Sequence, residues 1–357
     1  MPEYQFVDRA SEVIPALSAI DQIGLDTEFM REKTYFAELS LVQLSTPAGI
    51  YCLDPLAADD MAEFWAAAQP LNWVIHSGRQ DIEVVTQTAE VMPATVFDTQ
   101  VAAGLLGYAP QIGYANLVSQ LFGTSIAKSQ TRADWSKRPL SKAQLAYAAE
   151  DVEYLLPAAE TLSAELERKG RLAWAEEDSQ QLLNPALYET DPELAIHRLK
   201  GARNLRGRTR AVAAGLAAWR ESQALRANRP RQWIARDSAL MDIIKALPTS
   251  MDELTGIESL PPGLVRRAGK HLLSIVADNR ADESGYQPPP KPTEAQKRLL
   301  KDMQKHVATR ADELGIAAET LASKKELSAV IIGGSRDTRL LDGWRREFVG
   351  EKLLAVL

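Results

Sequence analysis

Cysteine and histidine are scarce in this chain. Cys52 is the only cysteine in 357 residues, which excludes an internal disulfide and a cysteine-built zinc site. The four histidines are scattered, so a histidine metal cluster is not expected either. They are His76, His197, His271 and His306. Any metal site in this protein is therefore expected to use oxygen ligands.

Long apolar runs are also missing. No segment reaches the roughly 18–20 apolar residues needed to cross a bilayer, and the start, MPEYQFVDRASEVIPAL, lacks a basic stretch followed by an apolar one. Apolar residues make up 45% and charged residues 25% of the chain, which is the balance of a globular protein. We therefore expect a cytoplasmic protein of two or three domains, with no membrane partner and no evident obligate protein partner.

The net charge of −7 hides an asymmetry along the chain. Residues 1–183 carry 26 acidic and 12 basic side chains, a balance of −14, whereas the remaining 174 residues carry 22 acidic and 29 basic, a balance of +7. Residues 191–236 alone hold eleven Lys or Arg and three acids. This density is typical of a face that binds a phosphate backbone, and a solvated helix surface is the alternative.

The first half of the chain mixes strand and helix patterns. Residues 23–29 predict a buried strand, and residues 39–44 and 49–53 predict two more that are close enough to form an antiparallel meander. Residues 73–75 and the segment ATVFDTQVAAGLLG each predict a strand that leads into a helix.

Two helix starts carry capping-box signatures. Ser77 is followed three residues later by Gln80, and Ser141 is followed by Gln144. The second signature opens a long helical pattern that Pro157 is expected to kink or break.

Strand signals end near residue 184. The segment 184–193, NPALYETDPE, is predicted to be a linker, and helical patterns follow it. A polar, proline-rich second linker, DESGYQPPPKPT at 282–293, precedes another small helical unit. The motifs AWRES at 218–222 and GWRREF at 343–348 indicate a divergent internal repeat.

Two carboxylates interrupt the first predicted strand. Asp26 and Glu28 are two residues apart, so on a strand their side chains point to the same face. Two like charges in a half-buried position favour protonation unless a cation lies between them. A hard divalent metal resolves this conflict, and a strand end with both groups in water is the alternative.

Two further carboxylates are placed where a metal site would collect them. Asp81 falls in the first turn of the helix that follows residues 73–75, and Asp151 lies four residues after Tyr147, on the same helix face. Four carboxylates, Asp26, Glu28, Asp81 and Asp151, match two Mg²⁺ or Mn²⁺ ions. Such ions, about 3.5–4 Å apart, promote phosphodiester cleavage by activating a water and stabilising the leaving oxygen.

Five blocks of this sequence, in this order and at suitable spacing, resemble bacterial ribonuclease D. They are GLDTEF, HSGRQDIEVV, FDTQVAAGLLGY, DWSKRPLSKAQLAYAAEDVEYLLP and WRESQALRANRPRQWIARD. The resemblance implies an α/β ribonuclease H-like exonuclease domain, a mixed sheet flanked by helices, over residues 1–184. It also implies two small all-α HRDC-type domains, over 195–281 and, in divergent form, over 293–357.

The same resemblance implies roles for five residues. Asp26, Glu28, Asp81 and Asp151 match the metal-binding acids of the DEDD exonucleases, and Tyr147 matches the tyrosine of the DEDDy branch. The implied activity is a 3′–5′ exoribonuclease that trims the 3′ ends of structured RNA such as tRNA precursors and releases nucleoside 5′-monophosphates. A packed aromatic with a wet hydroxyl is the alternative for Tyr147.

Other residues are candidates for contacts to RNA. Near the motifs these are Phe29, Met30, Tyr35, Gln43, His76, Arg132 and Arg138, and in the basic stretch they are Arg203, Arg206, Arg208 and Arg210. Aromatic residues can stack on bases and arginines can bind phosphates. Core packing is the alternative for Phe29, Met30 and Tyr35, a hydrogen-bonded structural role is the alternative for Gln43, His76 and Asp98, and Trp135 is expected to be buried.

Two other functions remain open at the level of sequence. One is a 3′–5′ DNA exonuclease of the same superfamily, since nothing in the carboxylate site visibly reads a 2′-hydroxyl. The other is a non-catalytic RNA-binding protein. The complete acid set with Tyr147 argues against this second reading, because a pure binder gains nothing from carboxylates that repel phosphate.

Overall fold

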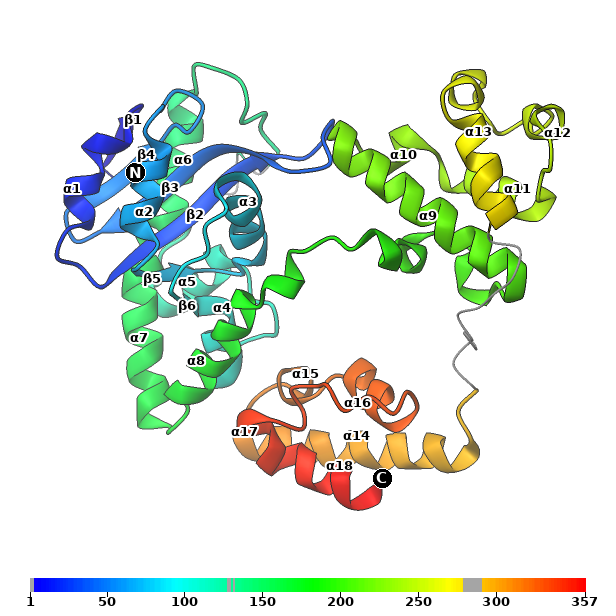
Figure 1. Ribbon diagram of the computed structural model, residues 1–357. Helices are drawn as coiled ribbons and strands as arrows, with labels where there is room; N and C mark the ends of the chain where they lie inside the picture. The colour runs from blue at the N-terminus through cyan, green and yellow to red at the C-terminus, as the bar shows by residue number, and fades with distance from the viewer. Residues whose placement is uncertain (1–2, 127–129, 131, 279–290) are drawn as a thin grey trace. The chain divides into compact units, whose positions relative to one another are not determined.

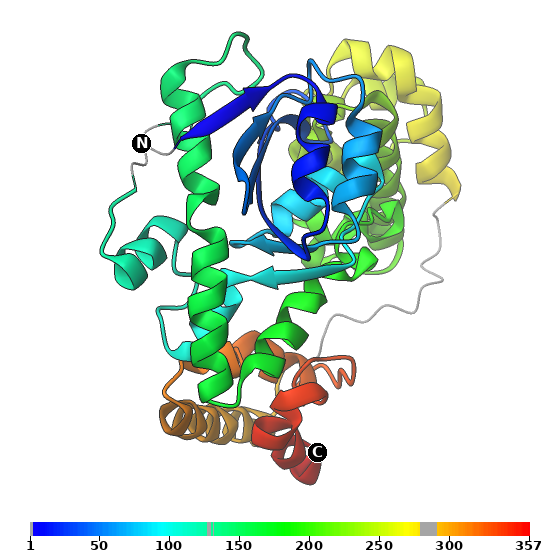
Figure 2. The same cartoon turned by 90° about the vertical axis from the view of Figure 1, so that its left-hand side faces the viewer.

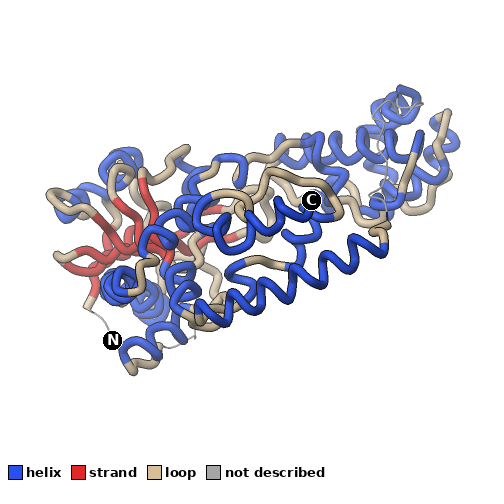
Figure 3. The backbone as a smooth tube through the Cα atoms, turned by 90° about the horizontal axis from the view of Figure 1, so that it is seen from below, coloured by secondary structure: helices blue, strands red, loops and turns tan. Residues whose placement is uncertain are grey.

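The computed structural model describes residues 3–126, 130, 132–278 and 291–357. The chain forms two compact units. The first unit consists of Met1–Met30, Glu38–Tyr188 and Pro292–Leu357, and the second of Arg31–Ala37 and Glu189–Lys291. Figure 3 shows that the strands gather in one part of the chain, which belongs to the first unit. Within the described ranges, no helix has the length and apolar character to cross a membrane.

A six-stranded mixed sheet forms the centre of the first unit, in the order β1-β4-β3-β2-β5-β6. Its strands are β1 (Tyr4–Val7), β2 (Gln22–Met30), β3 (Glu38–Thr46), β4 (Gly49–Leu53), β5 (Asn72–Ile75) and β6 (Thr95–Asp98). The pairs β2–β3 and β3–β4 are antiparallel, while β1–β4, β2–β5 and β5–β6 are parallel. The predicted meander and the two strand-to-helix steps are therefore confirmed.

Helices cover both faces of this sheet. They are α1 (Ile14–Leu17), α2 (Met61–Ala68), α3 (Arg79–Ala89), α4 (Thr99–Leu106), α5 (Tyr114–Phe122), α6 (Lys142–Glu153), α7 (Leu155–Arg168) and α8 (Leu172–Gln180), with a 3₁₀ turn η1 (Ala10–Glu12). Figures 1 and 2 show α1 and α2 on one side of the sheet and α6 on the other. The predicted mixed sheet flanked by helices is thus observed.

The helix starts agree with the sequence in one case and not in the other. The capping box of Ser141 and Gln144 is present at the start of α6. The capping box predicted for Ser77 and Gln80 is wrong, because α3 begins at Arg79 after Gly78 and the carboxylate of Asp98 takes the backbone N–H groups of Ser77 and Gly78 instead.

The break in the long helical pattern is also observed, slightly earlier than Pro157 itself. Helix α6 ends at Glu153 and α7 begins at Leu155, which places Pro157 in the first turn of α7. A proline is tolerated there because the first N–H groups of a helix have no partner within it.

Residues 292–357 pack on the helices of the first unit. They form α14 (Glu294–Leu314), α15 (Ala318–Leu321), α16 (Lys324–Ile331), α17 (Gly343–Arg345), a π-helical turn η6 (Arg346–Gly350) and α18 (Glu351–Val356). Their apolar residues, Met303 and Leu327 among them, share one core with α4, α7 and α8. The Trp174 and Trp344 rings stack with centroids 4.4 Å apart, and the buried guanidinium of Arg345 pairs with Asp178.

The second unit is helical and has a core of its own. It contains α9 (Gly207–Ala227), α10 (Arg231–Ile234), α11 (Asp237–Ala246), α12 (Met251–Thr255), α13 (Pro262–Asp278) and the 3₁₀ turns η4 (Pro192–Arg198) and η5 (Ala202–Asn204). The predicted linker at 184–193 contains the turn η3 (Pro185–Leu187), and η2 (Gln181–Leu183) precedes it. Most of the linker predicted at 282–293 lies outside the described residues.

Candidate active site

Strand β2 presents Asp26 and Glu28 to α6 and the residue between them to α3. Successive side chains on a strand point to opposite faces, and Thr27 accordingly contacts Asp81 of α3, with its backbone N–H 3.1 Å and its Oγ1 2.6 Å from Asp81 Oδ1. On the other face, carboxylate oxygens of Asp26, Glu28 and Asp151 all lie within 4.8 Å of one another. Asp151 belongs to α6, so the acids converge from a strand and a helix.

A cleft of about 210 Å³ opens over these three acids. Its lining consists of Asp26, Glu28, His76, Tyr114, Tyr147, Asp151 and Leu155. Tyr147 lies one turn before Asp151 on α6, as the spacing predicts, and its ring lies 6.1 Å from that of buried Trp135. The burial expected for Trp135 is confirmed.

Asp81 is held beside the cluster rather than within it. Its Oδ1 accepts both hydrogen bonds from Thr27, and it does not belong to the close group formed by the other three acids. Its charge still reaches the cluster, because it contributes to the raised pKa of both Asp26 and Glu28. Three of the four predicted acids therefore come together directly, and the fourth acts on them from the adjacent helix.

Loss of water contact raises the pKa of every acid at this site. For Asp26, desolvation is the largest cause and repulsion from Asp81, Asp151 and Glu28 adds to it, so its pKa lies well above the usual range. Desolvation, with repulsion from Asp151 and Asp81, raises the pKa of Glu28 to about 9. Desolvation is also the largest cause that raises the pKa of Asp151 to about 7 and that of Asp81 to about 6. A hydrogen bond from Tyr147 opposes the rise in the pKa of Asp151. The bare cluster consequently holds protons at neutral pH.

A divalent cation fits this set of groups. The donors are carboxylate oxygens, which Mg²⁺ and Mn²⁺ prefer, and a cation would relieve the repulsion that raises the pKa values of the acids. Gln43 adds a second observation. It lies directly across from Asp26 in the β2–β3 pair and is fully buried, and neither Oε1 nor Nε2 has a hydrogen-bond partner among the described residues. The amide of Gln43 therefore still requires hydrogen-bond partners, and these must come from polar groups that enter the space beside Asp26.

His76 reaches the cleft but is held by the protein. Its Nε2 lies 2.9 Å from the backbone oxygen of Ile112 and its Nδ1 lies 2.9 Å from Thr99 Oγ1. Burial is the main cause of the lowered pKa of His76. Both ring nitrogens of His76 therefore have hydrogen-bond partners within the protein.

Tyr114 is a member of the cleft that sequence reasoning missed. Its hydroxyl oxygen accepts a hydrogen bond of 2.9 Å from the backbone N–H of Tyr154, at the break between α6 and α7. Burial raises the pKa of Tyr114 well above its usual value, which keeps the hydroxyl protonated. The available signal was its position at the first residue of a helix after Gly113, but no motif marks it.

Among the predicted RNA contacts, Arg138 and Tyr35 are engaged within the protein. Arg138 donates to both carboxylate oxygens of Asp54, at 2.5 and 2.6 Å, and to the backbone oxygens of Ser40 and Trp135. Tyr35 donates its hydroxyl hydrogen to Glu221, in the second unit. These contacts are those of structural residues, and neither side chain is kept among the RNA contacts proposed below.

The remaining candidates lie at different places. Phe29 and Met30 end β2 and are partly buried, whereas Arg132 is exposed. Arg203 lies in η5, Arg206 immediately precedes α9, and Arg208 and Arg210 lie in its first turn. Arg203 and Arg206 are exposed and the other two are partly buried.

Comparison with known proteins agrees with this architecture. The family model described as 3′-5′ exonuclease matches residues 6–167, and the HRDC domain model matches residues 209–276. The sheet and its helices are thus those of a 3′–5′ exonuclease domain, followed by an HRDC domain.

Similarity to individual proteins extends over nearly the whole chain. Ribonuclease D of Acidiphilium cryptum is 39% identical over 95% of this chain and 88% of its own length, and that of Gluconacetobacter diazotrophicus is 37% identical over 94% and 87%. The crystal structure of Escherichia coli RNase D superposes with a TM-score of 0.90, at 28% identity, covering 99% of this chain and 98% of that one. The chain belongs to the ribonuclease D family of 3′–5′ exoribonucleases.

Proposed function

We propose that this exoribonuclease trims the 3′ ends of structured RNAs, tRNA precursors among them, in the cytoplasm, and that it releases nucleoside 5′-monophosphates. The observation that carries this proposal is the convergence of Asp26, Glu28 and Asp151 next to Tyr147 in one cleft. The E. coli relative, which is described as an exoribonuclease involved in structured RNA processing, supports the substrate class.

We further propose that the cleft works with two ions, Mg²⁺ or Mn²⁺. Asp26, Glu28 and Asp151 would hold one ion, and Asp26 with Asp81 the other. When bound, such ions supply an activated water and stabilisation of the leaving 3′ oxygen. Asp81 would contribute the oxygen that Thr27 does not occupy, because its two observed hydrogen bonds both use Oδ1.

The protein residues then have separate tasks. Tyr147 orients the attacking water through its hydroxyl, since a phenol with a usual pKa near 10 is a poor base at neutral pH. Glu28 accepts a hydrogen bond from the terminal 3′ hydroxyl, which favours chain ends as substrates. Tyr114, whose oxygen accepts the Tyr154 N–H, keeps its own hydrogen available to donate into the cleft.

RNA binding is assigned to two sets of residues. Phe29 and Met30 are proposed to contact the terminal nucleotides beside the acids, and Arg132, Arg203, Arg206, Arg208 and Arg210 to contact phosphates. As domain boundaries we propose 1–184, 195–281 and 293–357, with the last segment a divergent second HRDC domain.

One experiment separates this function from the two alternatives. Matched single-stranded RNA and DNA oligonucleotides carrying the same sequence are incubated with the protein in EDTA, in Mg²⁺ and in Mn²⁺. We expect nucleoside monophosphates from RNA only when a metal is present. Preferential degradation of DNA would favour the DNA exonuclease, and binding without degradation in either metal would favour the RNA-binding protein.

A further inference from the structure

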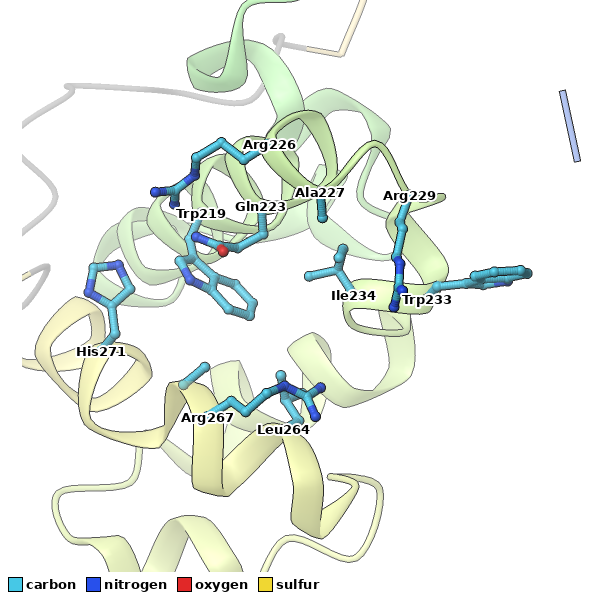
Figure 4. A pocket seen from close by; sticks show the side chains of 11 residues that line it. Trp219, Gln223, Arg226, Ala227, Arg229, Trp233, Ile234, Leu264, Arg267 and His271 are labelled. Atoms are coloured by element: carbon cyan, nitrogen blue, oxygen red, sulfur yellow. The ribbon is translucent and has the colours of Figure 1, made fainter. Parts of the chain in front are cut away.

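Polar side chains that line an open cavity need no partner within the protein. Figure 4 shows such a cavity in the second unit, with a volume of about 710 Å³ and a lining from α9, α10 and α13. Its arginines, Arg226, Arg229 and Arg267, are exposed, so water can satisfy their hydrogen bonds. An unpartnered polar atom is costly only where contact with water is lost, and this is the situation of Gln43 on β3.

The side chain of Gln43 is sealed from solvent. Its exposed fraction is 0%, and neither Oε1 nor Nε2 has a hydrogen-bond partner among the described residues. An amide buried in this way destabilises the fold, whereas an apolar side chain of the same size would not. The amide is therefore expected to gain a partner in another state of the protein.

Strand pairing decides which groups the amide can reach. Directly opposite residues of an antiparallel pair have side chains on the same face of the sheet. Gln43 lies opposite Asp26 of β2 on one side and opposite Cys52 of β4 on the other. Cys52 packs with Leu41 and with apolar residues of α6. The Asp26 carboxylate is consequently the charged group that faces the amide across the sheet, and it is well placed to enter the space beside it.

Two other roles for Gln43 do not agree with its position. The side chain is fully buried and does not line the acidic cleft, so it does not reach an RNA strand bound there. A purely structural role would require hydrogen-bond partners in the fold, and the part of the chain that the structure describes provides none for the amide.

We propose that Gln43 is a positioning residue for the metal site, and that its Nε2 donates a hydrogen bond to the Asp26 carboxylate when a divalent cation is bound. A carboxylate that binds an ion offers its remaining lone pairs to other donors, and such outer hydrogen bonds fix the orientation of the ligand. Asp26 is the acid assigned above to both ions, so its orientation affects the whole site. The inference rests on the proposed metal-dependent function and adds a residue that touches neither the ions nor RNA.

Gln43→Met tests this role with a side chain of similar length that has no amide. The full chain is titrated with Mn²⁺, and the free ion is measured by its electron paramagnetic resonance signal. Gln43→Met should bind Mn²⁺ at least about tenfold more weakly than wild type, which is the lower end of the loss expected when a partner of a metal ligand is removed. This measurement requires no RNA.

Melting temperatures separate positioning from a structural role. Because the amide has no partner in the metal-free fold, Gln43→Met should melt in EDTA at the same temperature as wild type or at a higher one. At a fixed Mn²⁺ concentration, the rise in melting temperature should be smaller in the variant, since weaker binding stabilises less. A structural amide would give the reverse, a lower melting temperature in EDTA and an unchanged rise with Mn²⁺.

Ser45→Ala is the matched control. Ser45 lies two residues after Gln43 on the same face of β3, and its buried Oγ also has no partner among the described side chains and backbone groups. It lies opposite Gly24 and not opposite an acid. Removal of its hydroxyl should therefore leave the Mn²⁺ affinity within about twofold of wild type.

Turnover gives a further measurement that separates the metal site from RNA binding. At saturating Mg²⁺, Gln43→Met should lower kcat on single-stranded RNA by about tenfold or more, as expected for a residue that orients a metal ligand. KM should stay nearly unchanged, because Gln43 acts on Asp26 and not on the strand.

Three results would overturn the proposal. The first is a Mn²⁺ affinity of folded Gln43→Met within about twofold of wild type, and the second is an equal loss of affinity in Gln43→Met and Ser45→Ala. The third is a lower melting temperature of Gln43→Met in EDTA with an unchanged response to Mn²⁺. If wild type itself binds no Mn²⁺, the proposed metal site fails together with Gln43, whereas Mn²⁺ binding that is equal in wild type and variant refutes the role of Gln43 alone.

Discussion

At residue scale, the environment of Asp26 differs sharply from that of its neighbours. Leu25 and Thr27 are buried on the strand, and the Asp26 carboxylate faces Glu28 and Asp151 with no cation among the described side chains close enough to form an ion pair. Such a position destabilises the ionised fold unless a cation binds. We therefore expect a divalent cation bound at this position to stabilise the folded protein.

Replacement of a ligand tests this directly. Asp26→Asn or Asp151→Asn should reduce turnover at saturating Mg²⁺ to below a few percent of wild type, because each removes an oxygen ligand and a charge. The same variants should melt at a higher temperature than wild type in EDTA, because an acid whose ionisation the fold opposes is replaced by a neutral amide. Glu160→Gln, an exposed carboxylate on α7, is the control and should change neither quantity. Activity above a few percent would remove that residue from the ligand set.

The raised pKa values predict how stability depends on pH. The folded protein holds protons on Glu28, with a pKa of about 9, and on Asp151, with a pKa of about 7, that the unfolded chain releases near pH 4. Because the folded state binds more protons in this window, its stability should fall as pH rises from about 5 to about 9.

Calorimetry in EDTA and in saturating Mg²⁺ measures this effect. The decline should be smaller in Mg²⁺, which binds the ionised form, and Glu28→Gln should flatten the upper part of the curve in EDTA. If Glu28→Gln and wild type follow the same curve in EDTA, the Glu28 carboxyl is not protonated in the fold at neutral pH.

The role of Tyr147 makes a separate kinetic prediction. Tyr147→Phe should slow the single-turnover rate by about 10²- to 10⁴-fold and leave RNA affinity nearly unchanged, because the hydroxyl acts on the water rather than on the strand. Tyr108→Phe, outside the cleft, is the control. A reduction of less than about threefold would return Tyr147 to a packing role.

Charge and spacing were enough to predict the clustered acids from the sequence. The roles of the other candidate residues depend on which side chains or backbone groups they contact in the folded protein. Asp26, Glu28 and Asp151 are improbable on buried faces without a function, so they could be named in advance. Arg138 and Tyr35 look equally functional in the sequence, but both are hydrogen-bonded to carboxylates in the fold. Arg138 donates to Asp54, 84 residues away in the sequence, and Tyr35 donates to Glu221, 186 residues away. Tyr114 could not be found, because its hydrogen bond to Tyr154 exists only in the folded chain.

At the scale of elements, one carboxylate fixes the starts of two helices. Asp98 ends β6 and caps α4 through the N–H groups of Gln100 and Val101. It also accepts from the backbone of Ser77 and Gly78, immediately before α3. Since α3 carries Asp81, the position of that acid depends on Asp98.

Asp98→Ala should consequently destabilise the protein by at least about 3 kcal/mol, because four backbone N–H donors, one buried and three partly buried, lose their acceptor together. Chemical denaturation measures the loss. Asp60→Ala is the comparison, since Asp60 also accepts two backbone N–H groups but is open to water, and its loss should be clearly smaller. Equal losses in the two variants would contradict the role assigned to Asp98.

The local sequence predicted the presence of helices and strands better than the residues at which they begin. Ser141 and Gln144 form the expected capping box because the two residues lie in the same turn of the chain. At Ser77 the same motif fails, because the carboxylate of Asp98, 21 residues further on, accepts the backbone N–H groups of Ser77 and Gly78 instead.

At the scale of the whole molecule, the last 66 residues complete the first unit rather than extend the chain outward. A helical pattern in the sequence indicates an apolar face but not the surface that this face packs against. The sequence therefore predicted a small helical unit at 293–357 but not the helices on which it packs. The structure provides that partner in α4, α7 and α8, together with the Trp174–Trp344 stack and the buried Arg345–Asp178 pair.

The shared core has a consequence for a chain that is cut before residues 292–357. If a specific protease recognition sequence is inserted between Asp278 and Lys291 and then cut, the carboxy-terminal fragment should stay bound and co-elute with the rest, because a shared apolar core holds it without the peptide bond. Dissociation should require denaturant at a concentration that also unfolds the sheet. Elution of the fragment as a separate folded species under native conditions would show that this core contributes little to holding the first unit together.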